Sequence, residues 1–462
     1  MEIVNNKYVS IVYIIMSVVS KPYIYEMSEE SPASRSIRTK LKSEEDSYAL
    51  SQRCIIQIPN TRNAVLNCSN TWVDLDISYS GLTGDGTSPL TGITLSSIGA
   101  YSVISEIIVE QGTNVIQHTR NHQEIMALLL LTNTDASSAL PLSISAGTGP
   151  LNTSRSRVGQ LQTVTGASPN GVIAKSTYSI PLIGILSSIK KLPLFQLNSP
   201  ISVTLVFTDR ITKILSSNLG STVSRLTDGQ ATITASINAD ILLLSDRAIQ
   251  DIMNASNIGN SGIMSWSDSA IELVKTNVSV DEQNSANENI KVQIQGGLKP
   301  KRLLSCCVFG TNIPNGNCDA YQTYNYGSGT AQIRLGNQLH PPRPYKGLGQ
   351  LTQSVLSVVQ QNSLPLQSNM LSTTYNTLSQ RQPGPGVAEA TNLIKNGVVF
   401  GLSFKSWYDS REGIDSSQQQ LETMISLKTS SSPATLSMTS NFVKRYGTII
   451  SVAEDGQMTV AY

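Results

Sequence analysis

Charged side chains are scarce in this sequence. Asp, Glu, Lys and Arg make up 14% of the 462 residues, and the formal net charge is +1. Binding of nucleic acid through counterion release needs clustered positive charge, and no arm rich in Lys and Arg stands at either end of the chain. We therefore expect no sequence-specific binding of nucleic acid.

Histidine and cysteine, which supply many metal ligands and catalytic groups, are also few. His118 and His122 are four residues apart, but no glutamate stands at the position that a zincin requires. The cysteines show neither metal-ligand spacing nor a disulfide framework, so we expect reduced thiols at Cys54, Cys68, Cys306, Cys307 and Cys318. No catalytic, cofactor-binding or metal-binding residue is predicted, and the sequence does not indicate an enzyme.

Three short patterns resemble functional motifs. Ser187-x-x-Lys190 has the spacing found in penicillin-binding enzymes but lacks their partner motifs. The glycine-rich stretch 81–92 lacks the Lys-Ser/Thr ending of a phosphate-binding loop. A solvated turn already explains the pair Asp281 and Glu282, and the alternative is that these carboxylates help to hold a cation between subunits.

The apolar run at residues 8–20 is too short to span a bilayer, which takes roughly 20 residues. It has the length of a signal-peptide core, and a secreted chain would be glycosylated at sequons beginning at Asn67, Asn152, Asn254 and Asn277. Alternatively, Met27 opens a polar, mixed-charge start. On both interpretations we expect residues 1–48 to lie outside the folded core, as a flexible arm or as residues upstream of the true initiator.

Short alternations of apolar and polar residues recur from Arg53 onward, separated by clusters of Gly, Asn, Ser and Pro. Residues 73–79, 202–207 and 231–241 place apolar side chains at every second position, which predicts half-buried strands and an all-β sandwich. Asp74 and Asp76 fall on the polar face of the first of these strands. Three segments instead show helical spacing, at residues 121–131, 245–257 and 348–359.

The length favours two domains, since single hydrophobic cores stop growing near ~250 residues. Gly, Asn and Ser cluster at residues 257–267, and alternation restarts beyond them. We therefore expect domains at residues 49–260 and 261–462. Strands of the second are predicted at residues 271–280, 290–295, 303–309, 331–335, 398–404, 421–427, 447–452 and 457–461. The extended segment His340-Pro-Pro-Arg-Pro344 suggests a rigid spacer.

In this order, the landmarks resemble the double jelly-roll major capsid proteins of eukaryotic DNA viruses, in particular the adintovirus and polinton-like group. The resemblance covers residues ~50–462. It rests on the strand pair 53–59 and 72–79, on 100–116 with its Gly112-x-Asn114 turn, on 179–186, 191–194 and 201–207, on 332–344, and on the closing pair 447–452 and 456–460. The first ~48 residues have no counterpart.

This resemblance implies two tandem antiparallel eight-stranded jelly-roll sandwiches with a few short helices. It further implies a structural protein of the virion, assembled inside the host cell. Homotrimers would tile an icosahedral shell around a DNA genome and contact neighbouring capsomers, pentons and minor capsid or cement proteins. A secreted or cell-surface β-sandwich adhesin is the alternative. A β-sandwich hydrolase that uses Glu106, His118 and His122 is a third class, and it lacks a recognisable acid/base constellation.

Overall fold

The computed structural model describes residues 35–80, 93–133 except 97, 141–148 except 143, 174–181, 191–217, 230–260, 264–281, 289–294, 302–312, 330–335, 337–346, 400–404, 421–426 and 435–461, with a few shorter stretches between them.

The first half folds into a roll of eight main strands in two facing antiparallel sheets. One sheet has the order β1-β13-β5-β9 and the other the order β3-β11-β7-β8. Numbered along the chain, these are strands one, eight, three and six against two, seven, four and five, which is a jelly roll. The bounds are β1 (Arg35–Lys42), β3 (Arg53–Ile58), β5 (Trp72–Ser80), β7 (Ile104–Gln111), β8 (Asn114–Thr119), β9 (Ala174–Pro181), β11 (Ile201–Phe207) and β13 (Gln230–Leu243).

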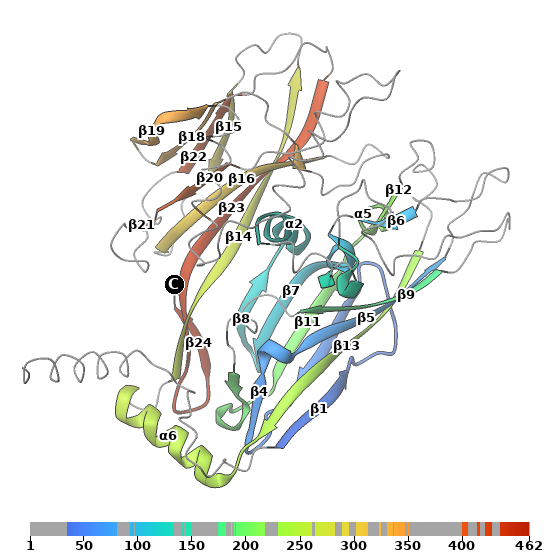
Figure 1. The fold of residues 1–462 in the computed structure, drawn as a ribbon, viewed down its shortest axis with the longest axis vertical. Helices are drawn as coiled ribbons and strands as arrows, with labels where there is room; N and C mark the ends of the chain where they lie inside the picture. Colours follow the sequence, from blue (N-terminus) through green and yellow to red (C-terminus); the bar gives the residue numbers. More distant parts are fainter. Residues whose placement is uncertain are drawn as a thin grey trace, which may run out of the picture.

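The second half repeats this topology without repeating the sequence. Its sheets have the orders β14-β23-β16-β20 and β15-β22-β18-β19, again one, eight, three, six against two, seven, four, five. Figure 1 shows the two rolls with α6 at the lower end. The bounds are β14 (Met264–Asp281), β15 (Asn289–Ile294), β16 (Arg302–Asn312), β18 (Thr330–Leu335), β19 (Gln338–Lys346), β20 (Phe400–Ser403), β22 (Leu421–Ser426) and β23 (Thr435–Val452). The predicted fold class is therefore confirmed.

Shorter elements extend this framework. The larger sheet of each roll reaches seven strands through short additions, and β6 pairs with β12 separately. These strands are β2 (Tyr48–Ala49), β4 (Ala64–Asn67), β6 (Ile93–Leu95), β10 (Lys191–Pro193), β12 (Leu215–Ser217), β17 (Thr323–Tyr324), β21 (Ile414–Asp415) and β24 (Met458–Ala461). The helices are α2 (His122–Asn133), α5 (Ile211–Ile214) and α6 (Asp246–Asn260), with 3-10 turns at Cys68–Asn70, Gly99–Val103 and Leu194–Gln196.

The prediction that residues 1–48 form an arm outside the core is wrong for residues 35–48. β1 is the first strand of the first roll and pairs with β13 from Arg35↔Leu243 to Lys42↔Ser236. Tyr48 is buried, and its ring centroid lies 5.8 Å from that of Phe207. The strand's charged residues are exposed while Ile37 and Leu41 are half-buried, so its polar composition reflects an outward face. Residues 1–34 lie outside the described residues.

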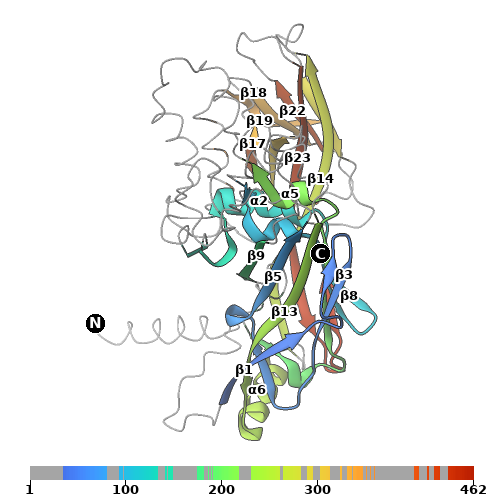
Figure 2. The same ribbon diagram turned by 90° about the vertical axis from the view of Figure 1, so that its right-hand side faces the viewer.

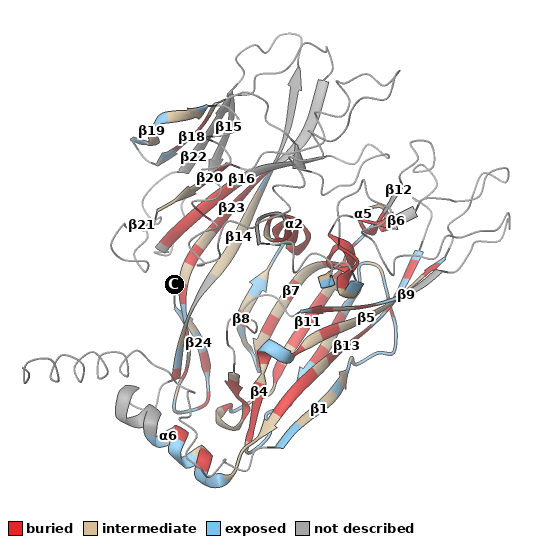
Figure 3. Ribbon diagram, viewed as in Figure 1, coloured by how far each residue is buried: buried red, intermediate tan, exposed pale blue. Residues whose placement is uncertain are grey.

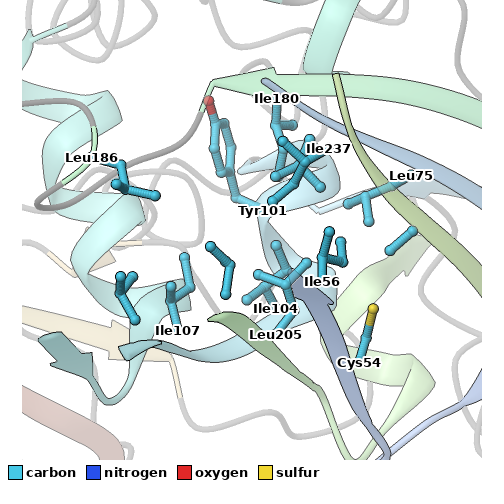
Figure 4. Close-up of a cluster of buried hydrophobic side chains, with 14 of the residues drawn as sticks. Cys54, Ile56, Leu75, Tyr101, Ile104, Ile107, Ile180, Leu186, Leu205 and Ile237 are labelled. Atoms are coloured by element: carbon cyan, nitrogen blue, oxygen red, sulfur yellow. The ribbon is translucent and has the colours of Figure 1, made fainter. Parts of the chain in front are cut away.

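The core of the first roll lies between its two sheets. Figure 4 shows Leu75, Ile180 and Ile237 from one sheet close to side chains of the other sheet. These positions are buried because alternation along each strand turns every second side chain inward (Figure 3). The partners from the second sheet are Cys54, Ile56, Ile107 and Leu205.

Two of the three predicted helices are confirmed. α2 begins at His122, one residue after the predicted cap, and the Ile125 N–H donates to the Asn121 carbonyl at 3.2 Å. α6 is capped as expected, since the Ala248 N–H donates to the Ser245 hydroxyl at 3.3 Å. Most of the third predicted helix lies outside the described residues.

The His340-Pro-Pro-Arg-Pro344 segment is extended, as predicted, but it is not a spacer. It lies in β19, which pairs with β18 at the edge of the smaller sheet. Prolines are tolerated at an edge because an edge strand needs no donor on its outer side.

Candidate functional site

The three hydrolase candidates do not form one site. His118 on β8 contacts Glu106 on β7, with 2.9 Å between Nε2 and Oε2, and both side chains are about one third exposed. His122 instead starts α2, is 2% exposed, and lies with its ring centroid 6.4 Å from that of Tyr101. Burial lowers the pKa of His122 to about 4. Among the described residues, no group of three or more His, Cys, Asp or Glu could hold a metal ion.

The four cysteines that the structure describes are free and buried, as predicted. Burial raises the pKa of Cys54 to about 11 and those of Cys68 and Cys307 to about 12, so they remain thiols. Cys318, Glu282, the 81–92 stretch and the Ser187-x-x-Lys190 pair lie outside the described residues. In the described part of the chain, no helix combines the length and apolar character needed to cross a membrane.

The two aspartates lie on the outward face of β5, opposite its buried side chains, and hydrogen-bond with neighbouring polar side chains there. Asp74 accepts hydrogen bonds from Trp72 at 2.9 Å and Ser179 at 2.6 Å, and Asp76 accepts one from Thr177 at 2.6 Å. Both residues are half-buried. They connect β5 to β9, and no reactive group lies among these partners.

The structural feature that bears on function is the junction between the two rolls. β14 and β23 are 18 residues each and pair along their whole length, so at ~3.3 Å per residue they run for roughly 60 Å. They continue beyond the second roll to the side of the first, where β24 pairs with the end of β23 (Figures 1 and 2). This long ribbon belongs to one roll and lies against the other.

Polar contacts at the junction are made by neutral amides. The Gln111 side chain on β7 donates to the Gly456 carbonyl at 2.7 Å and accepts from the Met458 N–H at 2.6 Å. Asn114 donates to the Met458 carbonyl at 2.6 Å, and the Asn198 N–H donates to the Gly456 carbonyl at 3.2 Å. Such bonds depend little on ionic strength, unlike ion pairs between exposed groups.

Apolar contacts accompany them. Ile450, Val452 and Met458 are at most 1% exposed and belong to the same buried cluster as the core of the first roll. Trp266 and Val460 are half-buried against that cluster. The first roll therefore completes its core with side chains of the second half.

One ion pair also crosses the junction. Lys275 on β14 contacts Glu124 in the first turn of α2, and their side chains are 34% and 12% exposed. Solvent reaches the Lys275 side chain, whereas one oxygen of the Glu124 carboxylate is buried without a hydrogen bond, so burial of that charge offsets part of the attraction. The amide hydrogen bonds and the buried apolar cluster make up most of the contacts at the junction.

Sequence reasoning missed this junction. It predicted the closing strand pair, and Asp455-Gly456 is a hairpin signal, but nothing local indicates which surface the hairpin contacts. Nothing in the Gly112-x-Asn114 turn itself indicates that Asn114 bonds to Met458.

No family model and no curated protein sequence matches the chain. Solved structures do match. The crystal structure of the mavirus major capsid protein aligns with a TM-score of 0.59 and 12% identity, over 96% of this chain and 94% of that one. A model of the PBCV-1 virus capsid aligns with a TM-score of 0.57 and 11% identity (95% and 99% covered), and the Sputnik virophage structure with 0.55 and 10% (96% and 91%).

These likenesses show the fold. They extend over both rolls, so this chain has the double jelly-roll architecture of those capsid proteins. At 10–12% identity, function has to be argued from the geometry.

Proposed function

We propose that this protein is the major capsid protein of a DNA virus, a structural component of the virion. The observation that supports the proposal most directly is the pair of jelly rolls with identical strand order, held side by side by a buried junction. Two similar rolls in one chain make six in a trimer, which gives a nearly hexagonal block able to tile a flat facet. The full-length alignment with three solved capsid structures supports the same role.

The composition suits a block of this kind. Low charge permits large protein–protein contacts, and surfaces rich in Ser, Thr and Asn form hydrogen bonds that salt does not screen. We propose that homotrimers contact neighbouring capsomers, pentons and minor capsid or cement proteins, and that assembly takes place inside the host cell. We also propose that the chain divides into two domains near residue 260. We further propose that the protein belongs to the adintovirus and polinton-like group. The role is structural rather than enzymatic.

The adhesin alternative receives less support. Asn67 begins the first sequon, but its side chain donates to Asp240 at 2.9 Å, and its strand pairs with β10 and β13. A glycan on that nitrogen would have to replace the hydrogen bond. Sequencing the mature N-terminus separates the two readings, because cleavage near Ser20 with a glycan at Asn152 favours the adhesin.

The mass of the purified full-length chain tests the capsid proposal. We expect a species of three times the chain mass by light scattering, and hexagonal blocks or shells by electron microscopy. A strictly monomeric protein at high concentration, with no particles, would contradict it.

A further inference from the structure

The backbone of the turn between β23 and β24 lies in close contact with the first roll. Gly456 has φ +79°, a conformation that favours glycine. A Cβ atom there would lie 2.4 Å from the Gln196 carbonyl oxygen and 2.6 Å from the Asn198 nitrogen. The backbone therefore approaches the 196–198 segment of the first roll too closely for any side chain.

The turn is also held by hydrogen bonds of its own. The Gly456 N–H donates to the Ala453 carbonyl at 2.9 Å, and the Ala453 N–H donates to the Gln457 carbonyl at 3.0 Å. The Asp455 carboxylate accepts from the Gln457 N–H at 3.0 Å. A pre-formed turn loses little conformational entropy when it docks.

The first roll forms hydrogen bonds with the backbone of this turn. Gln111 is 3% exposed, and its amide bonds a carbonyl at residue 456 and an N–H at residue 458, as a neighbouring strand would. A displaced turn would cost the Gln111 amide two of its three hydrogen bonds and leave the one that it donates to the Asn198 side chain at 3.2 Å, so the site disfavours a displaced turn.

We propose that the hairpin of residues 449–461 is a latch that fixes the angle between the two rolls. Undocking the latch would open the first-roll core at Ile450, Val452 and Met458, whereas the Lys275–Glu124 ion pair between β14 and α2 lies outside the latch. Its consequence for assembly rests on the proposed capsid function, because a trimer of six rolls requires a constant angle within each chain.

Two glycines of the same β-ribbon provide a matched test. Gly456→Ala introduces the clash, whereas a Cβ at Gly447 would meet only the Leu304 side chain at 3.6–3.8 Å, which is ordinary contact. Hydrogen exchange of the full-length chain is compared by peptide. We expect amides of β8 and β24 to exchange at least about tenfold faster in Gly456→Ala, with β5 and β13 unchanged, and we expect Gly447→Ala to match the wild type.

Wild-type exchange at β8 and β24 in Gly456→Ala would overturn the proposal, as would equal acceleration in β5 and β13. If Gly456→Ala does not fold, Asn114→Ala removes one bond to Met458 and should accelerate exchange in β24 severalfold; no change there would also refute the latch. Trimer content is measured on the same samples. A monomeric wild type would refute the capsid proposal, while the exchange rates would still decide on the latch.

Discussion

His122 makes the first roll sensitive to acid. Its side chain is buried beside Tyr101, and burial lowers its pKa from 6.5 to about 4. The unfolded chain therefore binds the proton more tightly than the folded chain. Stability is unaffected above pH 6.5 and falls as the pH drops toward 4. At ~1.36 kcal/mol per pKa unit, the loss at a pH of about 4.5 is roughly 2.5 kcal/mol.

Replacing this histidine with an apolar side chain of similar size tests the argument. In a Trp266→Phe, Trp407→Phe background, Trp72 on β5 reports urea unfolding of the first roll. We expect the loss of unfolding free energy between pH of about 7.5 and 4.5 to be about 2.5 kcal/mol smaller in His122→Met than in the parent. An equal loss in His122→Met would refute the reasoning.

Three further outcomes follow from the packing. Burial raises the pKa of Asp240, but hydrogen bonds from Ser36, Asn70 and Asn67 lower that pKa overall. Asp240→Ala should therefore lower the free energy of unfolding in urea by about 1–3 kcal/mol and make β1 accessible to proteases. Protease cleavage unchanged from the wild type would contradict this. In a Cys318→Ser background, a thiol reagent should label none of the four buried cysteines until denaturant is added; fast labelling of the native protein would show that the core opens. Leu75→Ala should cost ~2–5 kcal/mol, and a cost below ~1 kcal/mol would mean that the two sheets do not close on this side chain.

Strands that alternate cleanly were predictable from the sequence. In β5, Val73, Leu75, Ile77 and Tyr79 are all buried, and the side chains between them are not. In β13 the same period places Ile233 and Ile237 in the core. Where one face meets a core and the other meets solvent, side-chain chemistry alone specifies the strand.

Other strands lacked that signal. β1 presents only Ile37 and Leu41 as large apolar residues, so its four basic residues dominated the sequence and indicated an arm. β23 was predicted only at its end, because Asn441, Lys444 and Arg445 look unsuited to a core. Lys444 is nevertheless buried, with its nitrogen 3.3 Å from Glu272 directly across the β14 pairing. The Tyr446 ring, 5.4 Å from the Lys444 nitrogen on the same strand, and Glu272 on the partner strand together accommodate that charge.

The candidate site was harder to predict than the fold for a related reason. Gln111 has a polar side chain at an inward position of β7, and local sequence makes such a residue an unexplained exception. It becomes intelligible once the backbone of residues 456–458 is beside it. A long-range contact that recognises backbone leaves almost no trace in side-chain chemistry, apart from a glycine where no Cβ fits.

The same contact explains how two rolls with one topology come to play different parts. Both have the strand order one, eight, three, six, yet among the described residues strands one and eight are 18 residues each in the second roll and 8 and 14 residues in the first. The second roll thus supplies the ribbon that reaches its neighbour. The first roll takes up the ribbon and gains core from it, so the two cannot exchange roles. In a trimer, rolls that supply the ribbon would then alternate with rolls that bind it. The assembly would keep threefold symmetry, while its outline would approach sixfold symmetry. Because amides and buried aliphatic side chains hold the pairing, the angle between the rolls should persist at salt concentrations that screen surface ion pairs.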